Sequence, residues 1–440
     1  MKQRGRHRRR KRGRALRAFL AGTALALTGA ATMISASQAT VDGNPGALKP
    51  LSSATDTAAL GLQAKQVPQR SLDRLASAMG RPVGVGAVLD DAADSLRDPD
   101  SCTDEERAAL PVEPAATRAY CWNGADTRSW RAGAVTTSGD ADDDGVWGQN
   151  RVILSGWTQD TGTAGRGLAR VAFVDANDLG HLRYTSVLLV VPVDGGRDYR
   201  ALGSRLSGMV WYQDKLLVTA DDEGRDALYV YDMNRVQRTT VDAAAVGRVR
   251  DGWSAHGYQY VLPAVGSYRL TGGDDAARPE SISLDRTTTP DSLVASSRPA
   301  ADSDRSTLLW RYSFSTTSTP MTPMAPMTQT ARSGLLATDF SGRAGPAEAY
   351  RTEGSDIGGV LSYHDNWFVA RVGSGDGHGT LWRQTGDGAQ AGRCGSEERR
   401  NCWSPDTPSL SYWEESGEVW TQSERMLFAL PLASMARALD

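Results

Sequence analysis

The hydrophobic and polar positions of this chain follow a short, repeated pattern from residue 130 to the C-terminus. Six apolar or alternating runs have the length of buried β-strands, and they recur at a mean interval of about 53 residues. These runs cover residues 151–157, 215–220, 260–265, 292–297, 367–372 and 418–422. Most of them are followed, after a polar turn, by a companion run, as expected of neighbouring antiparallel strands.

Several runs are preceded by a second pattern that predicts an opening strand. Residues 208–214 and 359–365 share a glycine, two apolar residues, a tyrosine and an aspartate at identical offsets, and residues 408–414 resemble both. A β-propeller blade is a four-stranded antiparallel sheet of roughly 40–50 residues, and these repeats supply its opening strand, tight turn, buried second strand and third strand. We therefore predict an all-β fold, a β-propeller.

The repeat gives six blades, and five is the alternative because the unit at 260–265 is short and that at 292–297 is irregular. A β-sandwich competes with this prediction, but about 300 residues of even strand spacing exceed a usual sandwich. We expect an N-terminal strand near Val135 to pair beside the last blade, since an unpaired edge invites aggregation.

Aromatic residues divide the chain into domains. None occurs between residue 40 and Ala119, so residues 40–120 predict a lead without its own core, partly helical and partly disordered. Helices are expected at 71–79 and 103–110. Residues 121–440 form the predicted propeller domain, and the Met/Pro/Thr-rich stretch 315–333 is expected to be a disordered insertion.

The first 39 residues resemble a cleavable export signal. Ten lysines or arginines and no acid precede an apolar run at 18–27, and small residues surround Ala39. An uncleaved membrane anchor is the alternative, although the run is shorter than a bilayer span. We expect an extracellular, monomeric protein.

Removal of this signal changes the charge balance. The chain has 49 basic and 52 acidic residues, so losing ten basic residues leaves 39 against 52. The acidic remainder disfavours nucleic acid and anionic membranes as partners.

Four cysteines predict two disulfides in an exported protein, and four cysteines allow three pairings. Proximity in the sequence favours Cys102–Cys121 and Cys394–Cys402. No Cys-x-x-Cys pair or suitably spaced histidine supports zinc.

An acidic loop is the most specific candidate for a cofactor site. Asp140, Asp142 and Asp144 stand at alternating positions before Gly145, as carboxylates do in loops that bind calcium. The glutamate that closes an EF-hand loop is replaced by Arg151. Calcium is therefore the one expected cofactor, and a solvated acidic hairpin is the alternative.

Catalytic candidates are weaker, because the chain has no nucleophile elbow and no His-Glu-x-x-His motif. Asp285 and Glu348 lie amid apolar or strand-like sequence and are the candidate acids for glycoside chemistry. Asp365 repeats the position of an aspartate in the earlier opening strand, which favours a structural role. Trp147 and Trp403 fall in predicted loops, where an exposed indole could stack on a sugar.

Residues 208–212 and 228–232 resemble uncharacterised secreted β-propeller-like proteins of high-GC Gram-positive bacteria, and the blade rhythm is loosely similar to olfactomedin-type propellers. These resemblances imply no activity and transfer no site residues. We expect a secreted, non-catalytic binding module that recognises an extracellular glycan or protein. The alternative is a propeller glycoside hydrolase or lyase that uses an Asp/Glu pair, so enzymatic activity is left open.

Overall fold

The computed structural model describes residues 43–161, 167–221, 225–272, 276–297, 307–316, 334–375 and 377–439. The predicted signal peptide, residues 1–39, lies outside the described residues, as do residues 317–333 of the predicted insertion. The chain divides into two compact units, residues 1–46 and 47–440, and all described strands belong to the second. Within the described residues, no helix is long and apolar enough to cross a membrane.

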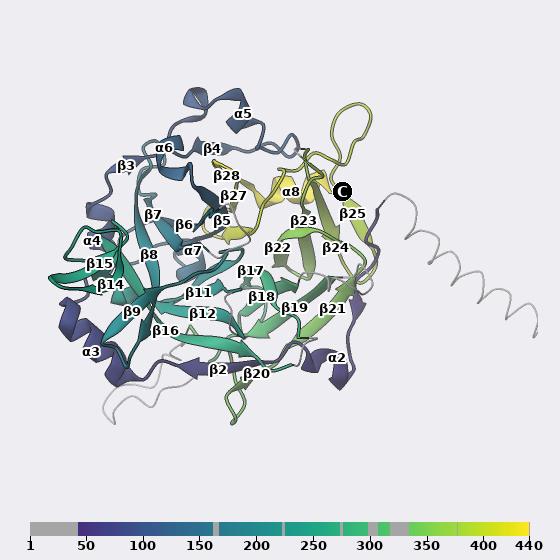
Figure 1. The fold of residues 1–440 in the computed structure, drawn as a ribbon. Helices are drawn as coiled ribbons and strands as arrows, with labels where there is room; N and C mark the ends of the chain where they lie inside the picture. Colours follow the sequence, from purple (N-terminus) through teal and green to yellow (C-terminus); the bar gives the residue numbers. More distant parts are fainter. Residues whose placement is uncertain are drawn as a thin grey trace, which may run out of the picture. The chain divides into compact units, whose positions relative to one another are not determined.

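Twenty of the described strands form five antiparallel meanders of four strands each, which are the blades of a β-propeller (Figure 1). Blade I contains β5 (Trp130–Thr137), β6 (Val152–Gln159), β7 (Ala169–Asp175) and β8 (Arg183–Val193); blade II contains β10 (Met209–Tyr212), β11 (Lys215–Thr219), β12 (Asp226–Asp232) and β16 (Tyr260–Leu270). Blade III contains β17 (Pro279–Asp285), β18 (Ser292–Ser297), β19 (Thr307–Ser313) and β21 (Glu348–Thr352); blade IV contains β22 (Ile357–Tyr363), β23 (Asn366–Arg371), β24 (Thr380–Gln384) and β25 (Ala389–Ala391). Blade V contains β26 (Ser411–Trp413), β27 (Glu418–Ser423), β28 (Met426–Pro431) and β4 (Arg118–Cys121). The prediction of an all-β propeller is confirmed.

The innermost strands of successive blades contact one another around the axis. The backbone N–H of Trp211 donates to Thr136 Oγ1 at 2.9 Å, and that of Val135 donates to Ser409 Oγ at 2.6 Å. Contacts between adjacent blades include those of Thr136 with Trp211, Gly208 with Ile282, Ser281 with Val360, Gly359 with Thr407, and Ser409 with Val135. They join blades I to V into one closed ring.

This packing explains the glycine that recurs in the opening strands. A Cβ at Gly208 would lie 2.8 Å from the Ile282 backbone nitrogen, and one at Gly359 would lie 2.6 Å from the Thr407 carbonyl oxygen. Each glycine therefore lets neighbouring blades approach at the axis.

An N-terminal strand completes the last blade, as expected, but it is not the strand near Val135. β4 pairs with β28, with Cys121 opposite Met426 and Ala119 opposite Phe428. Val135 instead lies in β5, where it is fully buried at the axis. Figure 1 shows β4, in blue, beside β28, in yellow.

The described residues hold five blades, which was the alternative count. Five of the six predicted buried runs are the second strands β6, β11, β18, β23 and β27. The run at 260–265 instead belongs to β16, the outer strand of blade II. This strand pairs in parallel with β8, from Tyr260 opposite Val187 to Pro263 opposite Val190, which explains its continuous apolar sequence.

The lead packs against the ring through short elements. Leu72, Leu75 and Met79 are buried on one face of α3 (Gln69–Met79), which confirms the first predicted helix. The second is shorter than expected, because α5 (Asp104–Arg107) ends after one turn that Thr103 and Glu106 cap reciprocally. β2 (Leu62–Gln66) pairs with β16.

The remaining helices are short and lie between the strands or at the C-terminal end. They are α2 (Ala54–Ala58), α4 (Gly84–Asp90), η1 (Pro99–Ser101), α6 (Gly124–Thr127), α7 (Ser138–Ala141), η2 (Met233–Arg235) and α8 (Leu432–Ala438). Further short strands are β1 (Lys49–Pro50), β3 (Asp94–Ser95), β9 (Asp198–Ala201), β13 (Gln237–Arg238), β14 (Val246–Val249), β15 (Gly252–Ala255) and β20 (Arg343–Ala344).

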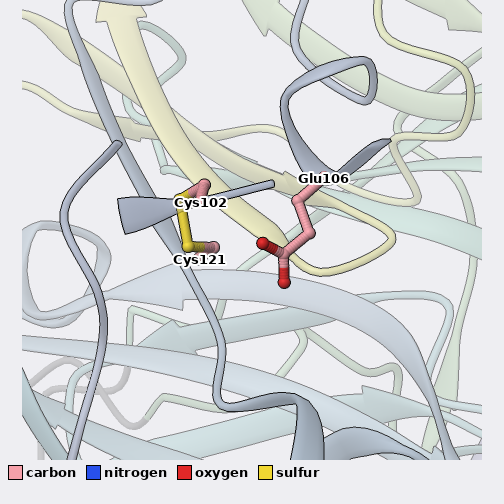
Figure 2. A group of neighbouring side chains, drawn as sticks. All are labelled: Cys102, Glu106 and Cys121. Atoms are coloured by element: carbon pink, nitrogen blue, oxygen red, sulfur yellow. A yellow bond between two sulfur atoms is a disulfide. The ribbon is translucent and has the colours of Figure 1, made fainter. Parts of the chain in front are cut away.

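Both predicted disulfides are formed. The sulfur atoms of Cys102 and Cys121 are 2.06 Å apart, and those of Cys394 and Cys402 are 2.00 Å apart. Figure 2 shows the first bond beside the Glu106 carboxylate. Although these three side chains are close enough to surround a metal ion, the sulfurs are bonded to each other and Glu106 pairs with Arg97, so they serve as structural groups.

Candidate functional site

A cavity of about 490 Å³ opens at the end of the propeller axis where the innermost strands begin. We call it the axial cavity. Four of the five blades line it, with residues that precede or begin an innermost strand and residues that end or directly follow a second strand. They are Arg205, Ser207, Glu280, Ser297, Asp356, Ile357, Gly358, Val372, Gly373, Ser374, Asp406 and Pro408.

Three carboxylates and one guanidinium group dominate the chemistry of this cavity. Arg205 Nη2 lies 4.0 Å from Asp406 Oδ2. Burial raises the pKa of Asp406, although the positive charges of Arg205 and Arg131 lower it. Such a carboxyl holds its proton at a higher pH than a fully solvated one.

Asp356 is held in a defined position on another wall. Its φ angle is 58°, in the left-handed region, and its Oδ2 accepts a hydrogen bond from Ser355 Oγ at 2.8 Å. Aspartate and asparagine tolerate this conformation better than most side chains. Asp356 therefore takes a backbone conformation that usually favours glycine and still places a carboxylate in the cavity lining.

Aliphatic groups form the rest of the wall. Val372 is 41% exposed, which is high for a large apolar side chain in this fold, and it lines the cavity together with Ile357 and Pro408. The cavity thus offers hydrogen-bond acceptors next to apolar surface, which suits a ligand with hydroxyl groups and C–H faces.

The predicted metal ligands do not converge. Asp140 is buried in α7 at the other end of β5, where its Oδ2 accepts from Thr136 Oγ1 at 2.6 Å and Ser411 Oγ at 2.7 Å. Asp142 and Asp144 are exposed and accept from nearby backbone N–H groups. The prediction that the three carboxylates converge on one point is therefore wrong, because residues 138–141 form the short helix α7, which directs the Asp140 side chain into the protein. Calcium binding itself stays a prediction that needs other ligands.

Burial raises the pKa of Asp140 to about 6, despite hydrogen bonds from Thr136 and Ser411 that lower it. The folded state therefore keeps this proton up to a higher pH than the unfolded chain, which releases it near pH 4. Stability is lost as the pH rises through this window, by about 3 kcal/mol. We predict that the free energy of unfolding of Asp140→Asn, relative to the natural chain, increases between pH 4 and 6 in urea titrations. A difference in free energy of unfolding between the two proteins that stays the same from pH 4 to 6 would contradict this prediction.

The two catalytic candidates come together, but away from the axial cavity. Asp285 Oδ2 lies 3.4 Å from Arg311 Nη2, and Glu348 Oε2 lies 3.2 Å from Arg311 Nη1. Asp365 Oδ1 is 3.6 Å from the same guanidinium group, whose carbon lies 5.0 Å from the Trp367 ring centre. Asp285 is the last residue of β17, whereas the cavity residue Glu280 is the second residue of that strand. Their arrangement is a charge cluster between blades III and IV.

The loop tryptophans are not exposed stacking surfaces. Trp403 is 1% exposed and donates through Nε1 to Thr407 Oγ1 at 2.9 Å, so the expected exposed indole is wrong. Trp147 is half-buried and packs on Trp211, with 5.2 Å between ring centres. Both indoles pack against the ring, because removing their apolar surface from water lowers the free energy of the folded protein.

The sequence contains a signal for the cavity that the search for motifs missed. Arg205 and Asp356 stand three residues before Gly208 and Gly359, at the same position of the repeated opening strand. Since the loops that enter innermost strands converge on a propeller axis, aligning the repeats would have found both residues.

Comparisons with known proteins give distant likenesses. No protein-family model matches this chain, and no curated protein matches its sequence. A gluconolactonase from Xanthomonas campestris is 11% identical, with a TM-score of 0.30 over 80% of this chain and 98% of its own. Drosophila semaphorin 1a, extracellular domains 1–2, is 10% identical, with a TM-score of 0.29 over 73% and 88%.

The extracellular domain of a putative one-component system from B. thetaiotaomicron is 10% identical, with a TM-score of 0.25 over 68% of this chain and 38% of its own. The gluconolactonase and the semaphorin are propeller-type folds. At this distance none of these likenesses indicates what this chain binds or does. The resemblance to secreted proteins of high-GC Gram-positive bacteria is not confirmed by them.

Proposed function

We propose that this chain is an exported β-propeller that binds the end of an extracellular glycan in the axial cavity. The observation that carries the proposal is the grouping of Glu280, Asp356 and Asp406 with aliphatic side chains in one concave site. Carboxylate oxygens accept hydrogen bonds from sugar hydroxyls, and the C–H faces of a sugar ring pack on apolar walls.

The size of the cavity favours a glycan end over a folded protein. Its volume of about 490 Å³ falls within the range of small-molecule sites. A protein partner would instead need an interface of roughly 800 Å² on each side. The export part of the proposal is supported by the N-terminal signal pattern and by the two disulfides, which persist in oxidising compartments.

The proposal is tested by replacing one cavity carboxylate. Asp356→Asn keeps the shape and tolerates the left-handed backbone, but it removes the charge that strengthens hydrogen bonds from hydroxyls. We expect calorimetric binding of a neutral oligosaccharide identified by screening to weaken about tenfold or more.

Asp387→Asn is the matched control, because Asp387 is exposed in the turn between β24 and β25 and does not line the cavity. Its binding should equal that of the natural chain. Equal binding by Asp356→Asn, with both variants folded by circular dichroism, would refute the axial cavity as the glycan site.

A glycoside hydrolase or lyase working in the same cavity is the second candidate. The observation that favours it is the raised pKa of Asp406, since a carboxyl that retains its proton can act as a general acid. The test is the release of reducing sugar from a polysaccharide. If Asp406→Asn abolishes this release and Asp387→Asn retains it, the enzymatic proposal replaces the binding proposal. Binding without turnover would leave the binding proposal in place.

A further inference from the structure

A second cavity lies between the lead and the outer strands of blades I and II. β8 and β16 pair in parallel as far as Val190 and Pro263 and then separate. Beyond that point β8 pairs with β9, while β16 pairs with β2 of the lead. The fork opens into a groove of about 680 Å³, which we call the basic groove. Figure 1 shows α3 and β2 beside β9 and β16 at this position.

The charges in the basic groove oppose those of the protein as a whole. Its lining contains four cations, Lys65, Arg70, Arg74 and Arg200, against two carboxylates, Asp194 and Asp226. Asp226 is already compensated, because its Oδ1 lies 3.6 Å from Arg269 Nε and accepts from Ser267 Oγ at 2.9 Å. Arg200 also has partners, including Tyr229 Oη at 3.4 Å, so the excess of positive charge in the groove comes from Lys65, Arg70 and Arg74, although the mature chain is acidic.

The cations of the lead are available to a ligand. In the described part of the chain, no ion pair involves Lys65, Arg70 or Arg74, and all three are exposed. Arg74 donates through Nη1 to the Gly195 carbonyl oxygen at 2.7 Å, which orients its guanidinium group at the groove wall. Positive charge is thus both concentrated and positioned.

Backbone contacts on both sides fix the walls. The Val67 N–H donates to the Val265 carbonyl oxygen at 2.9 Å, which ties the lead to β16. On the opposite wall, Gly196 has a φ of 80°, and a Cβ there would lie 1.9 Å from the Ser71 carbonyl oxygen. Only glycine permits this turn to press against α3, so the groove is formed before a ligand arrives.

We propose that the basic groove binds an acidic oligosaccharide, whose carboxylate or sulfate groups pair with Lys65, Arg70 and Arg74. Neutral polar groups beside them, including Gln66 and Tyr229, suit the hydroxyls of such a chain. A single-stranded nucleic acid is a poorer fit, because its bases stack on exposed aromatic side chains and the one aromatic residue in this lining, Tyr229, is buried. The basic groove shares no lining residue with the axial cavity, so this site is independent of the proposed function.

The test compares two double variants of the full mature chain. Lys65→Gln/Arg70→Gln removes two groove cations, and Arg248→Gln/Arg250→Gln removes two exposed cations from the β14–β15 hairpin. With a fluorescent oligogalacturonate and a sulfated heparin oligosaccharide as probes, we expect the first variant to bind roughly tenfold more weakly. The second should bind as the natural chain does. The tighter probe identifies the preferred anion.

Salt and ligand controls decide whether charge recognition is responsible. Binding should weaken as ionic strength rises from about 0.01 M to 0.15 M, since the Debye length falls from roughly 30 Å to 8 Å. Three results would overturn the proposal. Methyl-esterified oligogalacturonate would bind as tightly as the acidic form, the hairpin variant would lose as much affinity as the groove variant, or a thymidine oligonucleotide would bind more tightly than either acidic oligosaccharide. Asp356→Asn should retain the interaction, so failure here is distinct from failure at the axial cavity.

Discussion

Replacing Arg311 by methionine is expected to lower the free energy of unfolding by about 3–5 kcal/mol, because the Asp285 carboxylate would remain buried without its cation. The side chain of Arg311 is 3% exposed, and that of Asp285 is 0% exposed. Asp285 keeps hydrogen bonds to its Oδ1 from the N–H and hydroxyl of Thr287, but these do not replace a positive charge. Urea unfolding of the purified variant measures the loss.

Glu348→Gln is the matched comparison. Its carboxylate contacts the same guanidinium group but is 48% exposed, so solvent screens the pair and the expected loss is below about 1 kcal/mol. If both variants lost equal stability, the burial of Asp285 would not be what makes the cluster important. Asp285→Asn should likewise act on stability, and loss of a catalytic turnover at unchanged stability would restore Asp285 as a catalytic candidate.

The propeller was predictable because its blades repeat locally. Each opening strand and its buried partner are joined by a tight turn, so their pattern appears within about 15 residues of sequence. The blade number was harder to predict, since the run at 260–265 resembles a blade's second strand. Its apolar character comes from parallel pairing with β8, and a contact between strands 73 residues apart leaves no trace in local spacing.

The candidate sites were less predictable, because their members come from distant parts of the chain. The apolar sequence around Asp285 makes it a candidate catalytic acid, but this pattern reflects burial beside Arg311. The axial cavity joins residues as far apart as Arg205 and Asp406, and no short motif links them. The acidic loop shows the opposite error, since alternating aspartates suggested calcium while the local helix α7 turned Asp140 away from its neighbours.

Ring closure also escaped local analysis, although a closing strand was expected. The sequence predicts this strand near Val135, which instead lies in β5 of blade I. The observed closing strand, Arg118–Cys121, is only four residues long and follows a segment without aromatic residues. Its position depends on pairing with β28, more than 300 residues away, and on the disulfide of Cys121.

Replacing Cys102 and Cys121 by alanine is expected to lower the free energy of unfolding by roughly 3 kcal/mol, because a loop spanning 19 residues loses its cross-link. Replacing Cys394 and Cys402 opens a loop spanning only 8 residues, so the entropic effect is smaller.

The two cysteine variants differ less in how much unfolding free energy they lose than in which part of the structure opens. Cys121 lies in β4, so the first replacement loosens the strand that closes blade V, whereas Cys394 and Cys402 lie outside the pairing of β27 with β28. Hydrogen exchange of the backbone amides of β28 should accelerate in the Cys102/Cys121 variant and stay unchanged in the other, because local opening exposes only the amides that it unpairs. Equal protection of β28 in both variants would show that strand pairing alone holds the ring closed.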